Sequence, residues 1–177
     1  MKVLLGFCAS IFLIFLFPIS GFAQDSSKPK IQIDYDKFKD QTTYSIPAIQ
    51  VIGNAYEGIQ IGAGFGCDGK SNCEPRAIIF QLVTFVKGYN FFKDTNLIIL
   101  ADDERFKLGE MKSMVRREHI EGMVQYEILI AFLSIDNFSK ICKAKKVEMQ
   151  IGNVEFELKD IHMEALRDLF SHMGEKK

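Results

Sequence analysis

Two short segments that alternate apolar and polar residues, 147–151 and 154–158, constrain the fold of this chain more than any other feature. Only Gly152 and Asn153 separate them, and a two-residue loop of these types supplies the positive φ that tight hairpin turns require. Because the loop length sets the register, Phe156 and the other apolar side chains fall on one face. The sequence therefore predicts a β-hairpin with one buried face and one solvated, glutamate-rich face.

Helical patterns flank this hairpin on both sides. Before it, the hydroxyl of Ser134 can accept an N–H group at the start of a helix. Four apolar side chains then recur at helical spacing: Ile135, Phe138, Ile141 and Cys142. After the hairpin, Asp160 is expected to be the N-cap of a helix that ends at Gly174. The sequence thus predicts two short helices that pack on a sheet.

Extended segments precede residue 134 at intervals of roughly ten residues, with turn residues between them. They span residues 42–52, 57–65, 76–87, 97–101, 106–108, 114–120 and 123–133. Pro47, inside the first segment, indicates an edge strand or a bulge. The predicted fold class is α+β and mainly antiparallel β. We expect about eight or nine strands in a meander, a sandwich or a strongly curved sheet, with the two short helices in the C-terminal half.

The first 23 residues have the pattern of a secretory signal peptide. A basic second residue precedes an apolar run, and small residues occupy positions 21 and 23. Cleavage would make Gln24 the first residue of an exported protein, periplasmic or extracellular, with no remaining membrane span; an uncleaved anchor is the alternative. Residues 24–41 have the composition of a flexible leader, and residues 42–177 are expected to form one globular domain.

Three cysteines lie beyond the signal peptide. An exported chain meets an oxidising environment, so Cys67 and Cys73 are expected to form a disulfide. Closing so short a loop stabilises a protein by roughly 2–3 kcal/mol in the chain-entropy model. Cys142 lies on an apolar helix face and is expected to be a buried free thiol; an intermolecular bridge is the alternative.

The charge and the motifs restrict the function further. Without Lys2 the chain carries 21 basic (22 − 1) and 23 acidic residues, a net charge of −2, which argues against a nucleic-acid binder. The glycine-rich segment 58–64 precedes no helix, so a phosphate-binding loop is not predicted. Asp168 and His172 have the i, i+4 spacing of a metal pair, but an ordinary surface pair has the same spacing. We expect no cofactor and no bound metal.

Two groups of residues are weak candidates for contact with a partner. The first is an aromatic cluster beside a loop: Tyr89, Phe91 and Phe92. The second is a basic cluster: Arg116, Arg117 and His119. Exposed aromatic residues can mark a binding surface, although packing onto the core is the alternative for the first group. A charged strand face is the alternative for the second.

Three functions are compatible with these observations, and the first is preferred. It is a non-catalytic exported domain that binds an unknown protein or supports an envelope or extracellular assembly. The second is a carrier of a small apolar ligand, since 11 of the 16 phenylalanines lie beyond residue 23. A cavity lined by Phe65, Phe80 and Phe132 would distinguish the carrier. The third is a hydrolase that uses His119 or His162 with a carboxylate, although a hydrogen-bonded core position is preferred for His162.

Overall fold

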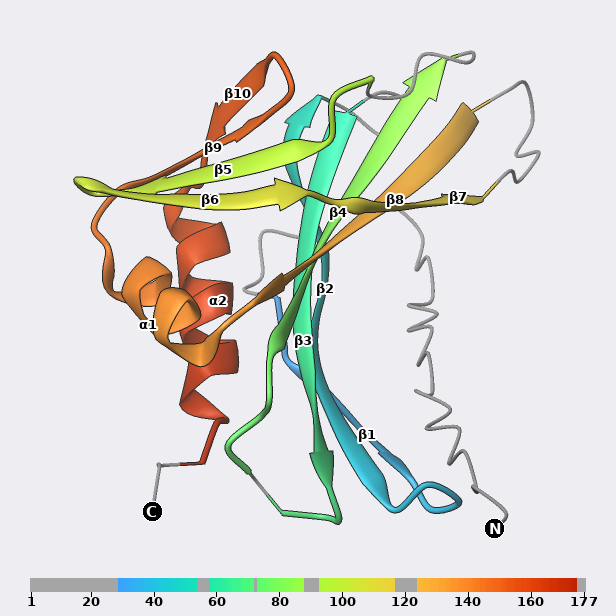
Figure 1. Cartoon of the computed structure of the whole chain (residues 1–177). Coiled ribbons are helices and arrows are strands. Elements are labelled where there is room, and N and C mark those ends of the chain that lie inside the picture. Colours follow the sequence, from blue (N-terminus) through green and yellow to red (C-terminus); the bar gives the residue numbers. More distant parts are fainter. Residues whose placement is uncertain (1–28, 54–57, 72, 88–92, 117–123, 175–177) are drawn as a thin grey trace, which may run out of the picture.

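The described part of the chain forms two open antiparallel sheets and two helices (Figure 1). This computed structural model describes residues 29–53, 58–71, 73–87, 93–116 and 124–174. No helix within those ranges is long and apolar enough to cross a membrane. The predicted fold class, mainly antiparallel β with two helices in the C-terminal half, is therefore confirmed.

One sheet has six strands and the other has four. The order in the larger sheet is β1 (Gln32–Asp36), β2 (Gln41–Gly53), β3 (Gly58–Asp68), β4 (Ile78–Lys87), β8 (Val124–Leu133) and β7 (Lys112–Arg116). The order in the smaller sheet is β10 (Val154–Glu157), β9 (Val147–Ile151), β5 (Asn96–Ala101) and β6 (Glu104–Glu110). The helices are α1 (Ile135–Lys143) and α2 (Asp160–Ser171).

The chain passes from the smaller sheet to the larger one at a single residue. Strands β6 and β7 follow one another in line, and only the buried Met111 separates them (Figure 1). The register of β5 and β6 shifts between Leu97 and Ile98, opposite Gly109, which has a φ of +76°. A bulge of this kind bends a strand and lets it turn a corner between sheets. The strands of the smaller sheet consequently run across those of the larger sheet (Figure 1).

The core lies where the two sheets and the helices meet. Helix α2 packs on β2 and β3 and also contacts α1. Strands of both sheets and both helices contribute side chains that are almost completely buried: Ile61, Phe65, Leu82, Leu129, Ile99, Met149, Phe138 and Leu166. One continuous apolar cluster therefore joins the sheets and both helices, as expected of a single domain core.

The hairpin of β9 and β10 has the predicted register. Val154 pairs with Ile151 and Phe156 pairs with Met149. Gly152 has a φ of +55° and Asn153 does not have a positive φ, which is the arrangement of a type II′ turn. The apolar side chains of the hairpin face the core, so this prediction is confirmed.

The helix boundaries confirm one predicted cap and correct the other. The Ser134 hydroxyl accepts the Asn137 N–H group at 3.2 Å and caps α1 as predicted. The N-cap of α2 is Lys159 rather than Asp160, and the helix ends at Ser171. The prediction was wrong because the Lys159 N–H group donates to Nδ1 of His162 at 2.9 Å, so a side chain inside the helix supplies the acceptor.

Two strands differ from the sequence prediction. Strand β1 lies inside the segment 24–41, so residues 32–36 are paired with β2 rather than part of a flexible leader. Pro47 lies in β2 at a register shift between Ile46 and Ile49, beyond Ser45, the last residue of β2 that pairs with β1. The bulge that Pro47 indicated is confirmed, and in this part of β2 the only paired neighbour in the described chain is β3. The predicted signal peptide, residues 1–23, lies outside the described residues.

Candidate functional site

The outward side of the four-stranded sheet presents two rows of side chains, which we call the outer face. One row runs across the strands through Arg105, Leu100, Glu148 and Glu157. The adjacent row runs through Lys107, Ile98, Gln150 and Glu155. Alternation along each strand sends these side chains away from the core while their neighbours are buried. Each row is basic on β6, apolar on β5 and polar or acidic on β9 and β10.

A groove of about 420 Å³ follows the middle of the outer face. Its lining residues come from all four strands: Ile98, Leu100, Arg105, Glu148, Met149, Gln150, Glu155, Phe156 and Glu157. The side chain of Leu100 is 37% exposed, an unusual position for a leucine in a sheet whose other face is fully packed. An exposed apolar strip with charged borders is typical of a surface that contacts another molecule.

The acidic border of the groove is partly neutralised by one lysine. Nζ of Lys146 lies 2.9 Å from Oε1 of Glu148 and 3.5 Å from Oε2 of Glu157. Hydrogen bonding and attraction to Glu148, with a smaller contribution from Glu157, raise the pKa of Lys146. Glu148 and Glu157 are direct cross-strand partners, so Lys146 offsets the repulsion between them. The carboxylates of Glu148, Glu155 and Glu157 and the ammonium group of Lys146 together carry a charge of −2.

The basic border has the opposite charge and no such compensation. Arg105 and Lys107 are exposed and carry a charge of +2. Within the ranges that the structure covers, neither side chain forms an ion pair or a hydrogen bond. The outer face can therefore offer apolar contact along its middle and charges of both signs along its borders. The polar groups that line the groove are carboxylates, one guanidinium and one amide.

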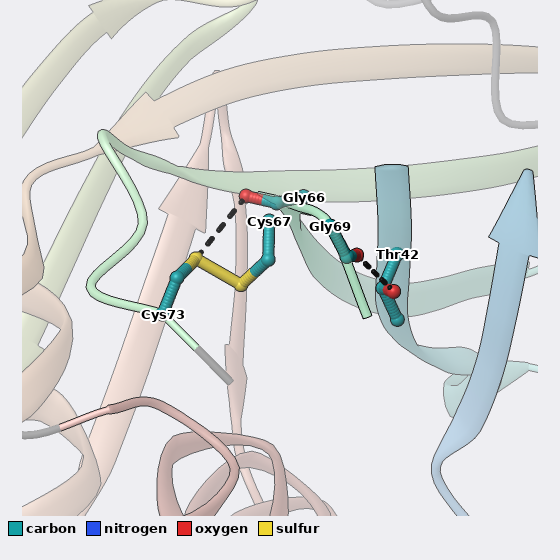
Figure 2. Close-up of a disulfide and its surroundings, with 5 residues drawn as sticks. All are labelled: Thr42, Gly66, Cys67, Gly69 and Cys73. Carbon is teal, nitrogen blue, oxygen red and sulfur yellow. Dashed lines mark hydrogen bonds between the residues drawn. A yellow bond between two sulfur atoms is a disulfide. The ribbon is translucent and has the colours of Figure 1, made fainter. Parts of the chain in front are cut away.

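The predicted disulfide is present at the other end of the molecule (Figure 2). Cys67 at the end of β3 is bonded to Cys73, which confirms the prediction. The closed loop is attached to β2, because the hydroxyl of Thr42 donates to the carbonyl oxygen of Gly69 at 2.6 Å. The carbonyl oxygen of Cys73 accepts the N–H group of Gly174 at 2.8 Å. The bridge therefore connects β3 to the end of the last helix and has a structural role.

Cys142 is a buried free thiol, as predicted. Its Sγ atom lies 3.6 Å from the carbonyl oxygen of Leu166 on α2. Burial raises the pKa of Cys142 to about 12, although Arg167 acts in the opposite direction. A thiol that remains protonated at neutral pH is a poor nucleophile. Cys142 is accordingly part of the contact between α1 and α2.

The two described histidines have structural partners. His162 is almost fully buried, and its Nδ1 accepts the Lys159 N–H group. The proton is consequently on Nε2, which donates to the carbonyl oxygen of Gln50 at 2.9 Å. Burial lowers the pKa of His162, which keeps the ring neutral. Nδ1 of His172 lies 2.9 Å from the carbonyl oxygen of Asp168 rather than from its carboxylate. The hydrogen-bonded core position predicted for His162 is confirmed.

The structure contains a buried acidic side chain that the sequence does not indicate. Glu127 on β8 is only 3% exposed and lies on the same face of the sheet as the core residue Leu129. The Ser113 hydroxyl donates to its Oε1 atom, whereas no described residue donates to its Oε2 atom. A glutamate between apolar neighbours in a strand resembles an ordinary exposed position in the sequence, so no local signal marks it as buried.

The remaining candidates do not form a site that can be described. Tyr89, Phe91, Phe92, Arg117 and His119 lie outside the described residues, and for Arg116 only its backbone position at the end of β7 is described. The three phenylalanines proposed to line a ligand cavity do not come together. Two of them, Phe65 and Phe80, are packed in the core, whereas Phe132 is 55% exposed.

Comparison of the chain with protein-family models, with curated proteins and with solved structures finds no match. In the part of the chain that is described, no group of three or more histidine, cysteine, aspartate or glutamate residues is arranged to hold a metal ion. The outer face is therefore the candidate functional site on geometric grounds alone.

Proposed function

We propose that this protein is an exported, non-catalytic binding module whose recognition surface is the outer face of the four-stranded sheet. The observation that carries the proposal is the exposed groove, in which Ile98 and Leu100 lie between an acidic border and a basic border. Exposed aliphatic side chains contribute free energy when a partner covers them. The charged borders then select which partner fits.

Two other features support export and a structural role for the rest of the chain. The first 23 residues have the pattern of a signal peptide. The bridge between Cys67 and Cys73 is of the kind that persists in oxidising compartments. The described residues with chemical reactivity, Cys142 and His162, are engaged in packing and hydrogen bonds. The outer face differs from the other exposed apolar positions, such as Phe38 and Phe132, in that its apolar residues line a groove between charged borders.

Site-specific photo-crosslinking in the producing cells tests this function. A photoreactive phenylalanine analogue replaces Leu100, in the middle of the groove, and the control places the same analogue at the exposed position Glu164 on α2. We expect a crosslinked adduct from position 100, in the exported fraction, and none from position 164. Equal labelling at both positions, or no adduct at position 100, would reject the outer face as a binding surface.

A further inference from the structure

We propose that the partner of the outer face is a second copy of this chain. The inference rests on the proposed function, because it names the occupant of the same surface. Two copies pack face to face about a twofold axis that runs parallel to the strands, between β9 and β5. The argument comes from how the charges are distributed over the four strands.

The two edge strands of the sheet carry opposite charges in the same two rows. In one row Arg105 of β6 and Glu157 of β10 are at opposite ends, and in the other row Lys107 and Glu155 are at opposite ends. Adjacent strands are about 4.8 Å apart, so three strand spacings place the ends of one row roughly 14 Å apart. The charges of one row therefore cannot form an ion pair within one copy.

A twofold axis parallel to the strands places β6 of one copy over β10 of the other and keeps each row in place. Arg105 then meets Glu157 of the second copy and Lys107 meets Glu155, and the symmetry forms each pair twice. An axis perpendicular to the strands would instead place β10 over β10, with carboxylates facing carboxylates. The charge pattern thus selects one of the two face-to-face arrangements.

The middle strands are compatible with the same arrangement. Leu100 and Ile98 on β5 lie over β9 of the second copy, where the aliphatic stems of Glu148 and Gln150 form the surface. The Glu148 carboxylate is already held by Lys146, so it does not enter the contact unpaired. Burial of Leu100, which is 37% exposed in one copy, supplies the apolar part of the contact.

The size of the outer face sets the strength of the association. Four strands of about five residues cover a flat area on the order of 300 Å². Stable interfaces bury about 800 Å² on each partner, so this contact belongs to the weak, reversible class. Because charge pairs at its borders are solvent-accessible, the association should weaken as salt is added. We expect a dimer that forms at high micromolar protein concentration and low salt.

Charge reversal of one pair tests the inference. Sedimentation equilibrium of the protein as recovered from the producing cells, at 50 mM and 500 mM salt, measures the dissociation constant. Arg105→Glu and Glu157→Arg should each weaken the dimer by about tenfold or more, because each variant brings two like-charge pairs together. The reversal Lys143→Glu, at an exposed position on α1 away from the outer face, should leave the dimer unchanged. Circular dichroism confirms that each variant is folded.

An equimolar mixture of Arg105→Glu and Glu157→Arg is the decisive sample. The mixed dimer restores an opposite-charge pair at both ends, so it should form with nearly the wild-type dissociation constant, whereas each variant alone dimerises at least about tenfold more weakly. A wild-type protein that stays monomeric at low salt, or a mixture that stays monomeric, would overturn the inference. If the analogue at position 100 nevertheless crosslinks to a protein of different mass, the outer face is still a binding surface but its partner is not a second copy. If position 100 gives no adduct at all, both the binding function and the dimer are rejected.

Discussion

The half-paired carboxylate of Glu127 provides the strongest test of how this core is stabilised. Replacement of Glu127 by methionine keeps a similar side-chain length and removes the buried carboxyl group. Among the described residues Oε2 of Glu127 has no hydrogen-bond partner, and the residue is 3% exposed, so the folded state leaves a buried carboxyl oxygen without solvent or a described donor. We expect Glu127→Met to stabilise the protein rather than destabilise it.

The magnitude follows from the single hydrogen bond that the carboxylate makes. A buried acceptor without a partner costs about 1–3 kcal/mol, and more when it is charged. The substitution forfeits the hydrogen bond from Ser113, so we expect a net gain of about 1–2 kcal/mol. For a domain of this size each kcal/mol raises Tm by about 2–4 °C.

Urea denaturation of a double-mutant cycle measures this effect. In the wild-type background, Ser113→Ala removes the remaining donor to Glu127 and should cost about 1.5–3 kcal/mol. In the Glu127→Met background the same change should cost little, because Ser113 is exposed and water replaces its partner. If Glu127→Met lowers the free energy of unfolding while the two changes are additive, the carboxylate contributes net stability and the reasoning is wrong.

Four further predictions concern other parts of the chain. Gly152→Val should lower the free energy of unfolding in urea by about 2–3 kcal/mol, because φ is +55° and a Cβ atom would lie 2.8 Å from a main-chain oxygen. The control Asn153→Ala should lower it by less than about 0.5 kcal/mol. Main-chain N–H donors at residues 146 and 145 lower the pKa of Asp102, so its contribution to stability is present above the unfolded pKa near 4 and is lost as the pH falls through the folded value. A pH series of urea denaturation should show a weaker acid dependence for Asp102→Asn, and an unchanged dependence would contradict the assignment. Cys142 should react with iodoacetamide at pH 8 only after unfolding, as measured by mass spectrometry, since rapid native labelling is incompatible with a pKa of about 12. The exported protein should begin at Gln24, and an intact mass that includes residues 1–23 would indicate a retained anchor.

The sequence predicts those parts of the fold whose signals are local. The turn at Gly152 and the cap at Ser134 were identified because each depends on a few adjacent residues. Strand β1 was missed because its alternating residues, such as Ile33 and Tyr35, are exposed, so no buried face distinguishes it from a leader. The N-cap of α2 was misplaced because its acceptor is the ring of His162, three residues inside the helix.

The outer face could not be predicted, because its existence depends on which strands become neighbours. Glu148 lies beside Leu100 only because β9 pairs with β5, and these residues are 48 positions apart in the chain (148 − 100). Alternation in each strand indicates which side chains face outward, but it does not indicate that a basic strand borders the same sheet. The opposite charges at the two edges therefore became visible only with the strand order.

The single-residue passage between the sheets at Met111 also has a consequence for the order in which the chain assembles. The central strands β4 and β8 are neighbours, yet Lys87 pairs with Val124, 37 positions later (124 − 87). Closing a loop of that length costs about 3 kcal/mol in chain entropy, beyond a constant.

Formation of the hairpin of β5 and β6 shortens this loop before the central pairing begins. Strand β7, which starts directly after Met111, then presents an edge to which β8 can pair. A fold whose central ladder depends on such distant pairing is expected to form in milliseconds to seconds rather than microseconds. The hairpin of β5 and β6 is therefore expected to form before β4 pairs with β8.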